Sequence, residues 1–274
     1  MRLLAIGGDR RMEGAAQAAL HAGWESEWRA DGCLARDETA DVVLLPWPHS
    51  FRQERLTVMP PHEGAAREDV LARIPPCRLL VHGSGVTAED VPQASDALDP
   101  GRDEQFLLAN AALTAEGAIC RAMQRMERAL MGSACLITGY GRIGRALCTR
   151  LCAMGAFVIV CARSEGQMQA AHAAGAHPVP LTQLPGAAPA ADLILNTVPA
   201  RVLNGEVLRS VRPDTLVLEL ASAPYGADLD AARALGVRVE VESGVPGRYA
   251  PLDAGAALFE TALRRLNREG ERHG

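Results

Sequence analysis

The stretch Ala134-Cys135-Leu136-Ile137-Thr138-Gly139-Tyr140-Gly141-Arg142-Ile143-Gly144 decides the fold. An apolar run meets a Gly-x-Gly-x-x-Gly loop, and a helical pattern follows it through Met154. In this context the first glycine makes a tight turn, the second lets the backbone approach a pyrophosphate, and the third lets helix and strand pack closely. The N–H groups and the dipole at the helix start favour an anion. The loop therefore predicts a dinucleotide site at Gly139, Gly141, Arg142, Ile143 and Gly144.

Apolar runs typical of buried strands recur on both sides of this loop. They follow it at residues 157–161, 193–197, 216–220 and 237–240, and they precede it at 41–45 and 78–81. A second strand–glycine–helix unit opens the chain, where Leu3–Ile6 runs into Gly7-Gly8. Strands that alternate with helices form parallel sheets. The sequence thus predicts an α/β protein with two doubly wound parallel-sheet domains, the second a Rossmann dinucleotide-binding domain.

We expect the chain to divide into four segments. Residues 1–113 form an N-terminal flavodoxin-like or Rossmann-like substrate domain. Residues 114–132 form a connector helix, because apolar residues recur there at three- and four-residue spacings. Residues 133–250 form the NAD(P)-binding Rossmann domain. The amphipathic segment 251–274 is expected to form a helix that packs back on the N-terminal domain.

Composition excludes several classes of function. The net charge is −5 and no basic stripe is present, which argues against a nucleic-acid partner. No apolar run approaches transmembrane length, so no membrane partner is expected. The seven cysteines show neither a CxxC pair nor histidines at ligand spacing, which predicts reduced thiols, no metal site and a cytoplasmic location. All the cationic side chains are Arg, so Lys chemistry is excluded and anions must be held by Arg or backbone N–H groups.

The end of the second strand after the loop favours NADP as the cofactor. NAD sites carry an acidic residue there, whereas this chain has Ala162-Arg163-Ser164. Arg163 could pair with a 2′-phosphate and Ser164 could donate to it. NAD stays possible, because Arg163 could instead be a solvated loop residue. The ends of later strands should lie beside the nicotinamide half of the cofactor and contribute Thr197, Val198, Pro199, Ser222 and Gly247.

Further motifs occur in order over nearly the whole chain. They are Ile6-Gly7-Gly8-Asp9-x-Arg11, Arg102-Asp103-Glu104, Asn110 with Thr114-x-Glu116-Gly117, the 139–144 loop, Ala162-Arg163-Ser164, Asn196-Thr197-x-Pro199, Leu218-x-Leu220-Ala221-Ser222, and Gly244-Val245-Pro246-Gly247 with Ala250-Pro251 and Ala254-Gly255. With these motifs the chain resembles the dipicolinate synthase A-subunit family. It departs from that family at Leu252-Asp253, where Lys-Thr is common.

The resemblance implies oxidation of dihydrodipicolinate to dipicolinate with NADP during endospore formation. It also implies a small dicarboxylate substrate and a flavoprotein-like second subunit, and we expect a homo-oligomer. Such a reaction needs a protein that orients the ring, holds two carboxylates and accepts a ring proton. Arg10 and Arg11 follow the first strand and are the candidate carboxylate holders, and the backbone N–H groups of Gly83-Ser84-Gly85 could also form an anion-binding nest. Glu116, near the start of the connector helix, is the candidate base, and Asp9 and Glu219 are its rivals.

Two other functions stay open. A 2-hydroxy acid dehydrogenase-like enzyme would have a similar two-domain shape, but resemblance to those enzymes calls for a late His, and no His lies between His177 and His273. A non-catalytic NADP-binding regulatory or scaffold protein fits the small number of obvious catalytic groups. Glu116 could then be a first-turn residue favoured by the helix dipole, and Arg11 a surface charge.

Overall fold

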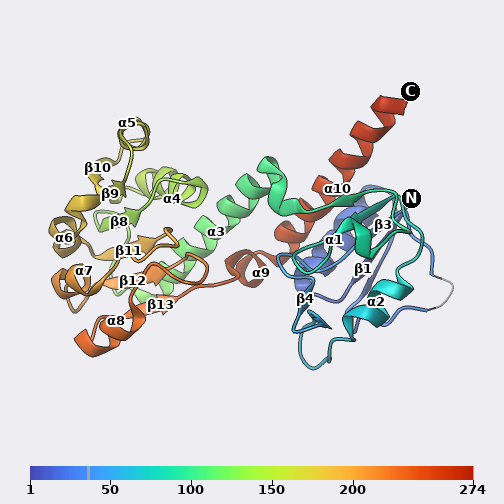
Figure 1. Cartoon of the computed structure of the whole chain (residues 1–274). Coiled ribbons are helices and arrows are strands. Elements are labelled where there is room, and N and C mark those ends of the chain that lie inside the picture. The colour runs from blue at the N-terminus through green and yellow to red at the C-terminus, as the bar shows by residue number, and fades with distance from the viewer. Residues whose placement is uncertain (36–37, 274) are drawn as a thin grey trace. The chain divides into compact units, whose positions relative to one another are not determined.

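The computed structural model describes residues 1–35 and 38–273. The chain splits into two compact units (Figure 1). Unit 1 comprises Met1–Asn110 and Pro246–Gly274, and unit 2 comprises Ala111–Val245. Each unit is built around its own parallel sheet with helices on both faces. The predicted fold class, two doubly wound α/β domains, is therefore confirmed.

The unit 1 sheet has the strand order β2-β1-β3-β6-β7, and its neighbouring strands are parallel. This is the flavodoxin-like order, in which the chain reverses direction across the sheet between β1 and β3. Its strands are β1 (Arg2–Ile6), β2 (Glu25–Arg29), β3 (Val42–Leu44), β6 (Leu79–Val81) and β7 (Ala97–Leu98), and a hairpin pairs β4 (Phe51–Arg52) with β5 (Arg55–Leu56). Its helices are α1 (Arg10–His21), α2 (Arg67–Arg73), α9 (Val245–Tyr249) and α10 (Pro251–His273), with short 3-10 turns at Ala88–Asp90 and Pro100–Arg102.

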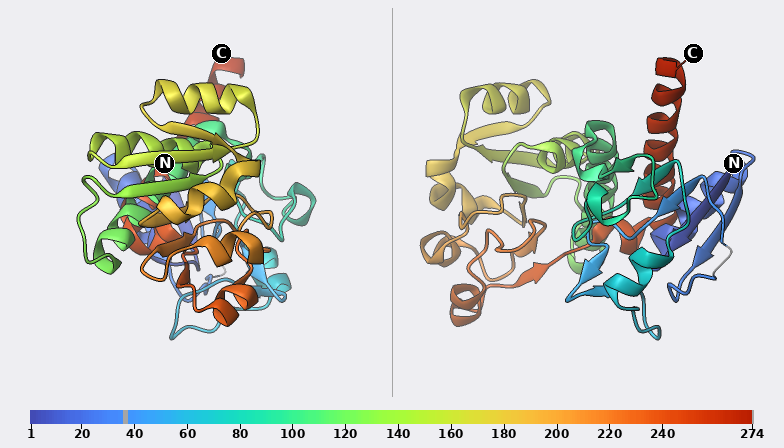
Figure 2. Two further views of the ribbon diagram at one scale, coloured as in Figure 1. Left: turned by 90° about the vertical axis from the view of Figure 1, so that its left-hand side faces the viewer. Right: turned by 45° about the vertical axis from the view of Figure 1, so that its right-hand side comes forward.

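The C-terminal helix α10 is part of the core of unit 1. Buried residues of α1 and α10 share one cluster with Leu3 and Ala5 of β1, while Leu4 and Ile6 face α2 on the other side of the sheet. Figures 1 and 2 show α10, in red, lying beside α1. The helices touch closely at Gly255, where a Cβ atom would lie 2.0 Å from the carbonyl oxygen of Arg11.

The unit 2 sheet has the order β10-β9-β8-β11-β12-β13, and all neighbouring strands are parallel. Numbered along the chain this is 3-2-1-4-5-6, the order of a Rossmann dinucleotide-binding domain. The strands are β8 (Ala134–Thr138), β9 (Phe157–Ala162), β10 (His177–Pro180), β11 (Leu193–Asn196), β12 (Leu216–Glu219) and β13 (Val239–Val241). The helices are α3 (Glu104–Arg125), whose residues belong to unit 2 from Ala111 on, α4 (Arg142–Ala153), α5 (Glu165–Ala173), α6 (Leu184–Ala187), α7 (Gly205–Ser210) and α8 (Leu229–Leu235), with 3-10 turns at Leu181–Gln183 and Ala188–Ala190.

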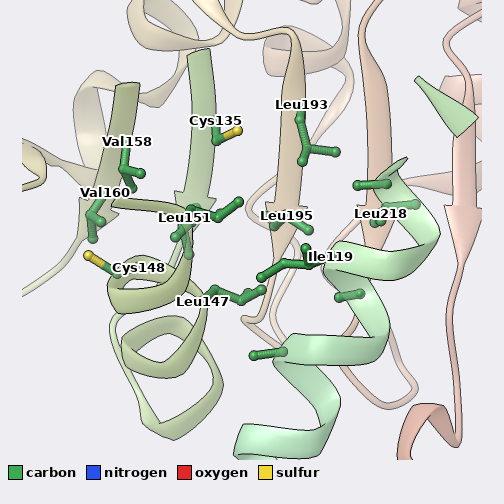
Figure 3. Packing of buried hydrophobic residues seen from close by; sticks show 14 of the residues in the cluster. Ile119, Cys135, Leu147, Cys148, Leu151, Val158, Val160, Leu193, Leu195 and Leu218 are labelled. Carbon is green, nitrogen blue, oxygen red and sulfur yellow. The ribbon is translucent and has the colours of Figure 1, made fainter. Parts of the chain in front are cut away.

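Helices cover both faces of the unit 2 sheet. On one face, Val158 and Val160 of β9 pack with residues of α3, α4 and α5, and Figure 3 shows Leu147 and Ile119 pointing into this layer. On the other face, Ile159 and Cys161 pack with residues of α6, α7 and α8. The two-residue alternation of buried side chains explains why these strands are almost uniformly apolar in sequence.

The helix predicted to begin at Thr114 begins ten residues earlier, at Glu104. Asp103 accepts a hydrogen bond from the backbone N–H of Phe106 at 2.8 Å, and Phe106 is buried against Trp47 in the core of unit 1. The helix ends at Arg125 and does not continue to Gly132. Leu130, five residues beyond this end, is buried in the core of unit 2.

The sequence analysis missed three edge strands of the two parallel sheets: β2, β10 and the two-residue β7. β2 has the sequence Glu-Ser-Glu-Trp-Arg and β10 has His-Pro-Val-Pro. Both pair on one side only, so neither needs the continuous apolar run of a central strand. Among the described residues, no helix combines the length and the apolar character that crossing a bilayer requires.

Candidate functional site

The glycine loop of unit 2 adopts the geometry that its three glycines predict. Gly139 has φ +86°, and a Cβ atom there would lie 2.7 Å from Cγ2 of Val198. A Cβ atom on Gly144 would lie 2.3 Å from the carbonyl oxygen of Gly139. The first glycine therefore lets the loop contact the segment after β11, and the third lets α4 pack onto the loop.

The second glycine faces open space. Gly141 is the N-cap of α4, no side chain accepts from the helix start, and a Cβ atom there would meet nothing within 4 Å. The backbone N–H groups of a first helical turn have no acceptor inside the helix. Arg142, Ile143 and Gly144 form that turn, so the site fits the pyrophosphate of a dinucleotide.

The residues after β9 present a cation and a hydroxyl. Ser164 is the N-cap of α5 and accepts a hydrogen bond from the backbone N–H of Gln167 at 3.3 Å. Its own hydroxyl proton remains available to a ligand. Arg163 is exposed and forms no ion pair with any residue that the structure describes. Both side chains can thus meet a phosphate without breaking an existing contact to an acidic group.

A buried polar network joins the ends of the three central strands of unit 2. The hydroxyl of Thr138 at the end of β8 donates to Oδ1 of Asn196 at the end of β11. Nδ2 of Asn196 donates to both carboxylate oxygens of Glu219 at the end of β12, at 2.7 and 2.8 Å. Sequence analysis missed Thr138 and Asn196 as site residues. The available signal was that each central strand ends on a polar side chain.

Glu219, a predicted rival for the catalytic base, is fully enclosed by donors. Its oxygens also accept backbone N–H groups of Ala221, Gly226 and Ala227 at 2.8–3.1 Å. Burial raises the pKa of Glu219, and these hydrogen bonds oppose that rise. Because every contact to the carboxylate is an N–H donor, the arrangement favours an anchoring role over proton abstraction.

Thr197, Val198, Pro199 and Ser222 lie on the two loops that this network holds. Thr197 donates through its hydroxyl to the carbonyl oxygen of Thr138 at 2.8 Å. Pro199 and Ser222 are exposed. The predicted residues at this edge of unit 2 are therefore brought together at the carboxyl ends of β11 and β12, where Rossmann sheets bind ligands.

Unit 1 has its own pocket, with a volume of about 180 Å³. It opens at the carboxyl ends of β1 and β3, where the strand order reverses and open α/β sheets bind ligands. Its lining combines apolar and cationic side chains: Gly8, Asp9, Arg11, Met12, Pro46, Trp47, Pro48, His49, Arg52, Thr57, Val58, Met59, Pro60 and Leu258.

Asp9 and Arg11 form a bidentate ion pair in this pocket. Nε and Nη2 of Arg11 each lie 2.8 Å from a carboxylate oxygen of Asp9, which also caps α1 by accepting the backbone N–H of Arg11. Gly247, predicted beside the nicotinamide, packs against this pair, and a Cβ atom there would lie 3.0 Å from Nε of Arg11. Its position follows from the return of the chain to unit 1 at Pro246.

His49 and Arg52 line the same pocket and escaped the sequence analysis, which treated residues 49–61 as a polar loop. Nδ1 of His49 lies 2.6 Å from Oγ of Ser84. Partial burial and the neighbouring Arg52 guanidinium lower the pKa of His49. Arg52 is exposed and has no acidic partner among the described residues. Arg52 lies in the β4–β5 hairpin, and His49 precedes it and forms a β-bridge with Ser84.

Glu116, the predicted base, was expected near the start of its helix, with a first-turn role as the alternative. Because α3 begins at Glu104, Glu116 lies in the middle of the helix instead. Its side chain is 60% exposed, and its Oε1 lies 2.9 Å from Nη2 of Arg150 on α4. No group of three or more His, Cys, Asp or Glu side chains suited to a metal ion occurs in the described part of the chain.

Comparison with known proteins identifies the relatives. Residues 105–225 match the family model of the D-isomer specific 2-hydroxyacid dehydrogenase NAD-binding domain. The dipicolinate synthase A-subunit of Bacillus subtilis strain 168 is 33% identical over 231 residues, which cover 82% of this chain and 77% of that protein. The chain belongs to the dipicolinate synthase A-subunit family. It therefore carries the nicotinamide-dinucleotide-binding domain of a dehydrogenase.

Two solved structures of the dipicolinate synthase A-subunit share the fold of this chain. The one from Bacillus halodurans superposes with a TM-score of 0.82 at 24% identity and covers 97% of each chain. The one from Bacillus subtilis superposes with a TM-score of 0.81 at 25% identity and covers 100% of this chain and 98% of its own.

The tail motif that carried the resemblance now has a physical basis. Gly247 leaves room for the Asp9–Arg11 pair, and Gly255 lets α10 touch α1 beside Arg11. Both glycines therefore help to shape the pocket side of unit 1.

Proposed function

We propose that this protein oxidises dihydrodipicolinate to dipicolinate with NADP, as part of a two-component synthase that works in endospore formation. The observation that supports this most directly is the cationic pocket of unit 1 in a chain of the dipicolinate synthase A-subunit family. A small dicarboxylate needs cations at both ends, and this chain supplies them with arginine alone.

Arg11 and Arg52 are the proposed carboxylate holders. The bidentate bonds from Arg11 to Asp9 fix the guanidinium plane and leave Nη1 for a substrate oxygen. Arg52 has no acidic partner among the described residues, so a carboxylate would not have to displace one. The role of Asp9 in this proposal is to position Arg11.

Glu116 is the proposed acceptor of the ring proton. Glu219 is enclosed by N–H donors and Asp9 is bonded to Arg11, whereas Glu116 has an exposed carboxylate with one arginine neighbour. The cofactor, when bound, supplies hydride acceptance. The protein has to hold the ring and remove one proton, because aromatisation drives the reaction.

NADP is proposed over NAD because of Arg163 and Ser164. Neither side chain pairs with an acidic group among the described residues. Hydrogen bonds from them to a 2′-phosphate would be charge-assisted and therefore stronger than neutral ones. We also propose a flavoprotein-like second subunit, since the name of the relative in Bacillus subtilis marks it as one component of a larger synthase. A homo-oligomer and a cytoplasmic location complete the proposal.

The test is an assay of dipicolinate formation by its ultraviolet absorbance, with NADP⁺ or NAD⁺ and with or without the second subunit. We expect turnover with NADP⁺. The Arg163→Ala variant should raise the KM for NADP⁺ by roughly ten- to a hundredfold, the value of a charged hydrogen bond, and leave the KM for NAD⁺ unchanged. Arg233→Ala, at an exposed arginine on α8, serves as the control. Equal effects of Arg163→Ala on both cofactors would contradict the NADP assignment.

A second candidate is a non-catalytic NADP-binding protein with a regulatory or scaffold role. It is favoured by the engagement of Glu116 with Arg150 and of Glu219 with N–H donors. Tight NADPH binding without turnover, both alone and with the partner, would support it. Turnover of a 2-hydroxy acid in place of dihydrodipicolinate would instead favour the dehydrogenase-like alternative.

A further inference from the structure

Glu219 is a fully buried carboxylate for which the catalytic proposal has no use. Its exposed fraction is 0%. Oε1 accepts from Nδ2 of Asn196 at 2.7 Å and from the backbone N–H of Ala221 at 2.9 Å. Oε2 accepts from the same Nδ2 at 2.8 Å and from the N–H groups of Gly226 and Ala227 at 3.1 and 2.8 Å. An ionised carboxylate, which only accepts, satisfies all five contacts.

These contacts tie together two loops that are separate in the chain. The backbone donors to Glu219 belong to the loop after β12, residues 220–227. Asn196 reaches the loop after β11, where its Nδ2 lies 3.1 Å from the carbonyl oxygen of Val198 and its Oδ1 accepts the N–H of Val198 at 3.2 Å. The loops touch at Gly226, where a Cβ atom would lie 2.3 Å from both Nδ2 of Asn196 and the carbonyl oxygen of Val198.

We infer that Glu219, acting through Asn196, is a positioning residue that sets the two loops receiving the nicotinamide half of the cofactor. The inference rests on the proposed function, because it assumes that a nicotinamide dinucleotide binds along this edge. The loops carry Thr197, Val198 and Ser222 at the carboxyl ends of β11 and β12, whereas the pyrophosphate is met by the 139–144 loop after β8.

A second buried carboxylate, with different contacts, follows β13, the strand next to β12. Glu242, directly after β13, is 4% exposed and pairs with Arg121 of α3 at 2.8 Å. The backbone N–H groups of Ala221, Gly226 and Ala227 in the 220–227 loop donate to Glu219. Both carboxylates are therefore buried, but Glu219 accepts from this loop, whereas Glu242 pairs with α3. This makes Glu242→Gln the matched control.

The experiment measures Kd by calorimetry for two probes, NADP⁺ and the adenosine-half fragment 2′,5′-ADP, with the full chain. In Glu219→Gln an N–H group replaces an acceptor and faces N–H donors, so the loops should shift. We expect NADP⁺ to bind about tenfold or more weakly, the cost of one unsatisfied buried group, and 2′,5′-ADP to change by less than about twofold. Glu219→Asp should recover part of the loss, and Glu242→Gln should leave both Kd values unchanged.

Other outcomes have distinct meanings. Equal weakening of both probes in Glu219→Gln, or no change in either, overturns the positioning role and leaves the proposed function standing. Failure of the wild-type chain to bind either probe overturns the proposed cofactor, and this inference with it. If Glu219→Gln does not fold, Asn196→Ala provides the same test, because it removes the bridge between the loops and retains the carboxylate.

Discussion

Single residues in this protein often do two structural jobs at once. Asp9 caps α1 through the backbone N–H of Arg11 and fixes the guanidinium of the same residue through two 2.8 Å contacts. A lysine could not replace Arg11, because a bidentate pair needs the planar fork of donors. Ser164 likewise caps α5 by accepting the backbone N–H of Gln167, which leaves its hydroxyl proton free to donate.

Two glycines of the 139–144 loop have different surroundings: Gly141 faces open space, whereas Gly144 packs against backbone. Gly141→Ala adds a methyl group where nothing lies within 4 Å, so we expect an unchanged melting temperature and a clear loss of affinity for NADP⁺. Gly144→Ala places a methyl group 2.3 Å from the carbonyl oxygen of Gly139. It should lower the free energy of unfolding by about 1–3 kcal/mol, as overpacking does.

Thermal unfolding and calorimetry on both variants check this pair. A Gly141→Ala variant that binds NADP⁺ as well as the wild type would show that the space in front of α4 does not hold the pyrophosphate. A Gly144→Ala variant as stable as the wild type would show that α4 can shift away from the loop.

The extent to which the sequence predicted the site depends on how local each feature is. The 139–144 loop was predictable because turn, glycines and helix start are contiguous in the chain. Asn196 and Glu219 were not predictable as a pair, because 23 residues separate them and only strand adjacency joins them. Arg52 was missed because it lies in a short hairpin with no sequence period long enough to detect. His49 was missed because its position depends on pairing with Ser84, which is 35 residues away in the chain.

At the scale of elements, the crossing of α1 and α10 determines the shape of unit 1. Gly14 and Gly255 let the two backbones approach closely, and Gly255 does so beside Arg11. The central strands and the pairing of strand with helix could be predicted from apolar runs. The start of α3 could not, because it depends on Phe106 packing against Trp47, which is distant in the chain.

Gly255→Ala tests the importance of this crossing. The new methyl group would lie 2.0 Å from the carbonyl oxygen of Arg11 and 2.5 Å from the backbone nitrogen of Ala15. We expect a loss of about 1–3 kcal/mol in the free energy of unfolding, because rigid backbone has to move. Denaturant titration measures it.

The matched control is Gly166→Ala in α5, where a Cβ atom would meet nothing within 4 Å. That variant should gain about 0.4–1 kcal/mol from reduced freedom of the unfolded chain. If Gly255→Ala raises the free energy of unfolding to the same degree, the stability of unit 1 does not depend on the close contact between α1 and α10.

At the scale of the whole molecule, unit 1 is discontinuous in the chain. Its first segment ends at Asn110, and its last segment, from Pro246, returns after the whole of unit 2. That last segment supplies buried side chains to the core around β1, among them Leu258, Phe259 and Leu266. Unit 2 is continuous, so its parallel sheet can form without either end of the chain.

A chain that stops after Val245 should therefore lose unit 1 and keep unit 2. Removal of a single buried Leu or Phe side chain costs about 2–5 kcal/mol, so loss of three exhausts a typical stability of about 5–15 kcal/mol. Hydrogen exchange should show fast exchange at β1 and β3, with protection retained at β8 and β11, and 2′,5′-ADP should still bind. A chain ending after Arg268 retains Leu266 and is the control. The chain ending at Val245 lacks the α10 side chains that pack in the core around β1. Protection of β1 in that chain would therefore contradict the prediction and show that unit 1 folds without α10.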